Sequence, residues 1–98
     1  MRKRTFNFDG SQGAAQMMVT ILNHYANVAY PIGGSDCAAA SREALQTIAT
    51  NIEQNEQAEI SRRQRPMLKS AVKWFYTESE YANPTEPMYN HLLLQFQK

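Results

Sequence analysis

The amino-acid sequence predicts an all-α fold, a small single-domain bundle of three to four helices with a short extended arm at the N-terminus. Apolar residues recur at steps of three and four along much of the chain, which is the spacing of one helix face. Glycines and prolines divide the chain into segments of helical length. Its 98 residues suffice for one domain with its own core, so we expect one unit over residues 1–98, with residues 1–10 as the arm.

The arm contains two aromatic residues, Phe6 and Phe8, separated by one position. Side chains two apart share one face of a strand, but the segment from Thr5 to Phe8 is too short to predict a sheet. Two interpretations therefore stay open, a short strand or an extended arm that packs both rings onto the helices.

The first helix is expected over residues 11–29, with Asp9 or Ser11 as its cap, because a short oxygen-bearing side chain can accept the free N–H groups of the first turn. The second is expected over residues 36–58, capped by Ser35 or Asp36. Their apolar faces consist of Ala14, Met18, Ile21, Tyr25 and Val28 in the first helix, and Ala38, Leu45, Ile48 and Ile52 in the second. Residues 53–59 are polar, so we expect this end to project into solvent or toward a partner.

The third helix is expected to begin at Pro66, since proline fits a first helical turn and disfavours helical geometry at the preceding Arg65. Its apolar face consists of Met67, Leu68, Ala71, Trp74 and Phe75, which predicts that Trp74 is mostly buried. The last helix is expected after Thr85, with an apolar side formed by Met88, Tyr89, Leu92, Leu93 and Phe96.

Positive charge is concentrated in two short segments, although the net charge is only +1. Eight of the ten basic residues lie there, namely Arg2, Lys3, Arg4, Arg62, Arg63, Arg65, Lys69 and Lys73. No acidic residue occurs between Ile60 and Thr77. Cations at the start of the third helix oppose the helix dipole, which is positive there, so their placement suggests a partner with a negative surface.

Three explanations of the central segment stay open: an anionic partner, ion pairing with the glutamates of the second helix (Glu53, Glu56 and Glu59), and simple solvation. We expect partner binding by Arg62, Arg63, Arg65, Lys69, Lys73 and Tyr76. Tyr76 is included because it falls beside the lysines on a helical wheel, which predicts a surface position. The N-terminal Arg2, Lys3 and Arg4 are either a groove-seeking arm, as in some DNA-binding domains, or a solvated tail.

The sequence contains none of the common patterns of catalytic or metal sites. Cys37 stands beside three alanines and is expected in the core, although a place in the first turn of a helix leaves its reactivity open. His24 and His91 have no second ligand at metal-binding spacing, so we expect capping or core roles for them. We therefore expect no enzymatic activity, no cofactor and no metal.

The basic start is followed by Thr5 to Gly10, which is not the apolar run of a signal peptide. No segment approaches the roughly 18 apolar residues of a membrane span. We therefore expect a cytoplasmic protein that does not bind membranes.

These observations favour a non-enzymatic protein-interaction module, a small inhibitor or adaptor of the kind that phages and plasmids encode against host enzymes. It would dock on the acidic surface of a protein or nucleoprotein complex, such as a nucleic-acid-processing one. The alternative is a small DNA- or RNA-binding regulator that uses the same basic residues, which the nearly neutral net charge argues against. A homo-oligomer, or a structural subunit of a larger assembly, is also compatible with the sequence.

Overall fold

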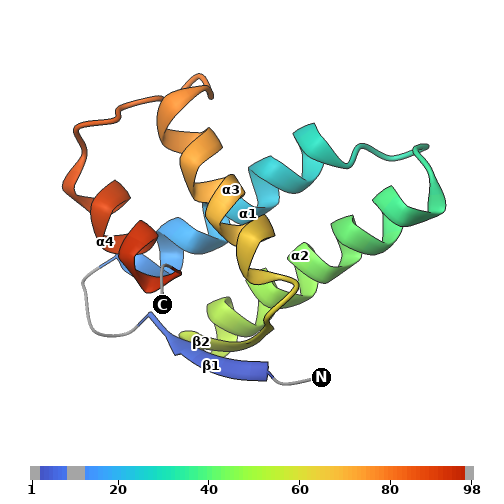
Figure 1. Ribbon diagram of the computed structural model, residues 1–98, viewed down its shortest axis with the longest axis horizontal. Helices are drawn as coiled ribbons and strands as arrows, with labels where there is room; N and C mark the ends of the chain where they lie inside the picture. Colours follow the sequence, from blue (N-terminus) through green and yellow to red (C-terminus); the bar gives the residue numbers. More distant parts are fainter. Residues whose placement is uncertain (1–2, 9–12, 97–98) are drawn as a thin grey trace.

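The computed structural model describes residues 3–8 and 13–96, which form four α-helices and one two-stranded antiparallel sheet (Figure 1). In chain order the elements are β1 (Lys3–Asn7), α1 (Ala14–Ala29), α2 (Asp36–Asn55), β2 (Gln57–Ser61), α3 (Arg65–Thr77) and α4 (Pro87–Gln95). The protein is mostly helical, as predicted. The all-α prediction is wrong in one respect, because the arm pairs with β2, which follows α2, as a two-stranded sheet.

The helices enclose one apolar core, with α1 packed along α2 and against α3, and α4 packed on α3 (Figure 1). Every helix contributes at least one fully buried side chain, including Met18, Ile21, Leu45, Ile52, Leu68, Val72 and Leu92. Trp74 is partly buried, with most of its surface covered as predicted, and packs against this core, with its ring centroid 5.7 Å from that of Tyr25. None of the described helices combines the length and the apolar character that a membrane span requires.

The ends of α1 and α2 follow from local backbone chemistry. Gly13 precedes α1 with a φ of 85°, a conformation that glycine adopts readily. The predicted caps of this helix, Asp9 and Ser11, lie outside the described residues. Ser35 caps α2 as expected, because its Oγ accepts a hydrogen bond from the Ala38 N–H at 3.2 Å.

Helix α2 ends three residues earlier than the sequence predicted, at Asn55. Glu56 takes the left-handed conformation, with a φ of 56°, while its N–H still donates to the Ile52 carbonyl at 2.8 Å. This single residue turns the chain from α2 directly into β2. Of the predicted polar helix end, residues 53–55 therefore remain in α2, and residues 57–59 lie in a strand.

The sheet joins the arm to the core. Phe6 pairs with Ala58, and Arg4 with Ile60, across the two strands. Phe6, Ala58 and Ile60 are buried on the inner face, whereas the residues between them point outward and are exposed. The Phe6 ring and the buried Phe8 ring both pack against Phe96, at centroid distances of 5.3 and 6.2 Å. Of the two interpretations of the arm, the strand is the one that the structure shows.

Candidate functional site

The pairing of β1 with β2 brings the two basic segments of the sequence together. Lys3 is opposite Ser61, and Arg4 is opposite Ile60, so the start of β1 lies beside the end of β2, where Arg62 and Arg63 follow (Figure 1). Arg2 lies outside the described residues. We use the name basic end for the basic residues of these two segments that the structure describes, which are Lys3, Arg4, Arg62, Arg63, Arg65, Lys69 and Lys73.

A reciprocal pair of hydrogen bonds orders the turn that carries two of these arginines. The Ser61 N–H donates to Gln64 Oε1 at 2.9 Å, and the Gln64 N–H donates to Ser61 Oγ at 3.2 Å. This reciprocal pattern is that of a capping box; here it closes the turn before α3, whose N-cap residue is Gln64. Arg62 and Arg63 lie between the two capping residues with exposed side chains, so they are presented on a structured turn. The Ser-x-x-Gln pattern was present in the sequence, but sequence reasoning missed it.

The remaining cations of the basic end lie on α3. Arg65, Lys69 and Lys73 recur at steps of four and therefore share one face of this helix. Lys73 is exposed, and the other two are half-buried. Within the described part of the chain, neither the lysines nor Arg62 and Arg63 form an ion pair.

The proposed internal pairing with acids of the second helix is thus not observed for these four cations. The direction of β2 gives the physical reason. Glu53 and Glu56 lie before the strand, whereas Arg62 and Arg63 follow its other end, so the length of β2 separates the acids from the cations. Glu59 lies within the strand, where its side chain is exposed.

The predicted surface position of Tyr76 is wrong. A helical wheel places Tyr76 beside the lysines, but only 3% of its surface is exposed. The chain after α3 folds back, with the Asn83 N–H bonded to the Tyr76 carbonyl at 2.9 Å, and Tyr89 of α4 stacks on the Tyr76 ring at 5.1 Å. Tyr76 therefore cannot contact a partner directly in this conformation.

The other chemically interesting residues are dispersed over the surface. Cys37 is exposed, so its predicted core position is wrong; the N-terminus of α2 extends beyond the packed helices and leaves its first turn in solvent (Figure 1). His24 is half-buried and meets the Phe75 and Tyr81 rings edge-on, whereas His91 is exposed. No group of three or more potential metal ligands occurs among the residues that the structure describes.

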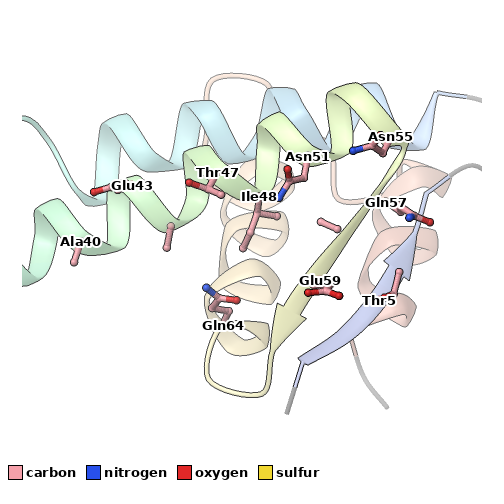
Figure 2. A pocket seen from close by; sticks show the side chains of 12 residues that line it. Thr5, Ala40, Glu43, Thr47, Ile48, Asn51, Asn55, Gln57, Glu59 and Gln64 are labelled. Atoms are coloured by element: carbon pink, nitrogen blue, oxygen red, sulfur yellow. The ribbon is translucent and has the colours of Figure 1, made fainter. Parts of the chain in front are cut away.

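A polar groove lies between α2 and the outer face of the sheet (Figure 2). It has a volume of about 560 Å³. Glu43, Thr47, Asn51 and Asn55 line it from α2 at steps of four, and Figure 2 shows Gln57, Glu59 and Gln64 on the opposite side. Amides and hydroxyls predominate, and the charged lining residues are both acids. The groove suits a hydrogen-bonding or cationic group, and the sequence analysis did not identify it, because its opposite side comes from a sheet that was not predicted.

No family model matches this chain, and no curated protein or solved structure is significantly similar to it. The assignment of a function therefore rests on the geometry of the chain itself.

Proposed function

We propose that the protein is a non-enzymatic interaction module that docks its basic end on an acidic surface of a protein or nucleoprotein complex, acting as an inhibitor or adaptor. One observation carries this proposal: the register of β1 and β2 unites two basic segments that are distant in the sequence. Arg62 and Arg63 are exposed on a turn held by the capping box.

The charge distribution supports a directional contact. Gathering cations on one surface costs energy through mutual repulsion, and a partner of opposite charge relieves that repulsion. The net charge is only +1, so acidic residues elsewhere on the molecule nearly balance the basic end. Such an asymmetric charge pattern orients the molecule as it approaches a negative surface and raises the association rate.

A charge-neutralised variant tests the proposal. Arg62→Gln, Arg63→Gln and Lys73→Gln together remove three exposed cations. The matched control adds three negative charges to the exposed residues of α2, through Gln46→Glu, Thr50→Glu and Gln54→Glu. Both variants change the net charge equally, but only the first alters the basic end.

Each variant is used as bait against an extract of the source cells, and captured proteins are compared by mass spectrometry after circular dichroism has verified folding. We expect the wild type and the α2 control to retain the same specific partner and the neutralised variant to lose it. Equal capture by all three would show that the basic end is not the interface. Loss in both variants would show that only net charge matters.

The second candidate is direct binding of DNA or RNA by the same cations. The clustering of arginines and lysines favours it, because phosphate contacts depend on such residues. Titration of labelled single- and double-stranded DNA and RNA at several salt concentrations separates the two candidates. For phosphate binding, the logarithm of the affinity should fall steeply and linearly with the logarithm of the salt concentration.

A further inference from the structure

The outer edge of β1 exposes backbone groups that the sheet does not use. The Phe8 N–H donates to the Glu56 carbonyl at 2.8 Å across the two strands. Backbone groups in an antiparallel pair alternate in direction from one residue to the next. With the observed register, Phe6 and Arg4 therefore direct their N–H and C=O groups toward β2, whereas Thr5 and Asn7 direct theirs to the outer edge.

A contact from α4 agrees with this alternation. Gln95 Nε2 donates to the Asn7 carbonyl at 3.2 Å, so that carbonyl faces away from β2. Neither the N–H nor the C=O of Thr5 is hydrogen-bonded to another described residue across this edge. One donor and one acceptor of Thr5 are thus available in the middle of β1.

These groups face a groove with two different walls. Four consecutive residues of β1, from Arg4 to Asn7, form one wall. His91, Leu94 and Gln95 of α4 form the other, and the groove has a volume of about 620 Å³. Leu94 is 61% exposed, which gives the helical wall an apolar site. A strand edge beside a helix is the arrangement in which many domains bind an extended peptide as an additional strand.

We propose that this groove binds an extended acidic segment of the partner as a third strand alongside β1. The proposal rests on the proposed function, since it specifies how an acidic partner is recognised. Charge complementarity identifies the occupant: the ionisable side chains of the lining are Arg4 and His91, and no lining residue is acidic. The exposed Arg4 guanidinium already lies over the Phe6 ring, 4.5 Å from its centroid, which positions it at the groove.

A second copy of this chain is a poorer occupant. Antiparallel pairing of two β1 edges about Thr5 would put Arg4 of each copy opposite Phe6 of the other and on the diagonal from the other Arg4, with no acidic lining residue between them. Like charges on neighbouring strands destabilise a sheet, whereas an acidic segment would neutralise them.

The test uses two synthetic peptides with blocked ends, each about eight residues long, a typical strand length. One alternates valine with glutamate, and its control alternates valine with lysine. Binding is measured by calorimetry, and exchange of the Thr5 and Asn7 amide protons is followed by NMR. We expect the glutamate peptide to bind and to protect the Thr5 N–H from exchange, and the lysine peptide to do neither.

Two pairs of variants locate the bound peptide. Thr5→Pro removes the outward N–H and leaves the hydrogen bonds between β1 and β2 in place, while its control Thr5→Val keeps that N–H. Loss of one hydrogen bond should lower the affinity of Thr5→Pro for the glutamate peptide about tenfold. The affinity of Thr5→Val should equal that of the wild type. If Thr5→Pro does not fold, Leu94→Asp tests the helical wall by charge repulsion, with Leu94→Met as its control.

The outcomes separate cleanly. Unchanged glutamate-peptide affinity in Thr5→Pro and Leu94→Asp, or an unprotected Thr5 N–H, would overturn strand addition. Equal binding of the lysine peptide would overturn the acidic occupant. A dimer of the wild type that Thr5→Pro dissociates, detected by analytical ultracentrifugation, would show that β1 pairs with a second copy instead. Arg62, Arg63 and Lys73 do not line the groove. If the partner is still captured after these three residues are neutralised, the proposed function fails, whatever the peptide experiment shows.

Discussion

The side chains of Ser61 and Gln64 each accept a hydrogen bond from the other residue's backbone N–H. Ser61 is also the last residue of β2, where it faces Lys3 of β1. One buried serine therefore ends the sheet and begins the turn into α3. The orientation of Arg62 and Arg63 depends on both strands as a result.

We predict that Ser61→Ala lowers the free energy of unfolding by about 0.5–1 kcal/mol, because the Gln64 N–H loses the Ser61 hydroxyl and keeps only the Ser61 carbonyl, 3.1 Å away. Urea denaturation followed by circular dichroism measures the change. Ser70→Ala is the matched control on the exposed surface of α3, where alanine should be neutral or slightly stabilising. Equal stability of the two variants would contradict a capping role for Ser61.

We predict that Tyr76→Phe leaves the free energy of unfolding unchanged or raises it by up to about 1 kcal/mol. The Tyr76 hydroxyl is buried and has no hydrogen-bond partner among the described residues. Removal of an unsatisfied polar group saves its desolvation cost and keeps the ring stacked on Tyr89. A clear loss of stability in urea denaturation would reveal a partner for the hydroxyl and count against this packing.

Alkaline pH should destabilise the protein, in part through Tyr76. Burial, and to a lesser extent the negative charge of Glu86, raises the pKa of Tyr76 above its ordinary value of about 10. A raised pKa in the folded state gives stability that is complete below about pH 10 and is lost as the pH rises through the folded-state pKa. Between about pH 9 and 12, the melting temperature should fall less steeply with rising pH for Tyr76→Phe than for the wild type. Tyr76→Phe should remove only part of the alkaline destabilisation, because burial also raises the pKa of Tyr25, which the variant keeps.

We predict that Phe8→Ala destabilises the fold by about 3–5 kcal/mol, the usual cost of truncating a fully buried aromatic side chain. The Phe8 ring is 1% exposed and packs on Phe96. Ile32→Ala is the control, since this large apolar residue is 86% exposed and its truncation should cost little. Guanidinium denaturation compares the two; a loss below about 1 kcal/mol for Phe8→Ala would mean that the arm is not part of the core.

Cys37 should react with a thiol reagent in the native protein about as completely as in the urea-unfolded chain. Its side chain is exposed in the first turn of α2, and access governs reaction with such reagents. Spectrophotometric titration with a chromogenic disulfide checks this expectation. Protection of the native thiol would restore the core position that the sequence suggested.

The four helices were predictable because the apolar residues that each helix buries recur at helical spacing within its own segment of sequence. In α3, for example, Leu68, Ala71 and Phe75 repeat at steps of three and four, and all three are buried. Such a pattern is local, so it needs no knowledge of what the helix packs against. The starts of α2 at Ser35 and α3 near Pro66 were equally local signals.

The sheet and the arrangement of the site were not predictable in the same way. β2 has Ala58 and Ile60 as its inward residues, too short a pattern to separate from the end of a polar helix. Its partner strand is remote in the sequence, so nothing near Gln57 indicates the pairing. The predicted surface position of Tyr76 was wrong for a related reason. A helical wheel drawn for α3 alone cannot show that α4 packs over the Tyr76 ring.

The contact of Phe6 and Phe8 with Phe96 has a consequence for how the polypeptide matures during translation. β1 is synthesised first but finds its strand partner only with β2 and its aromatic neighbour only with the residue after α4. Until Phe96 has left the ribosome, the Phe6 and Phe8 rings of the nascent chain lack this aromatic partner. Such apolar segments are what holding chaperones recognise. The packing of β1 is therefore completed only after translation of α4, and Phe6 and Phe8 are apolar residues that stay without this partner in the interval.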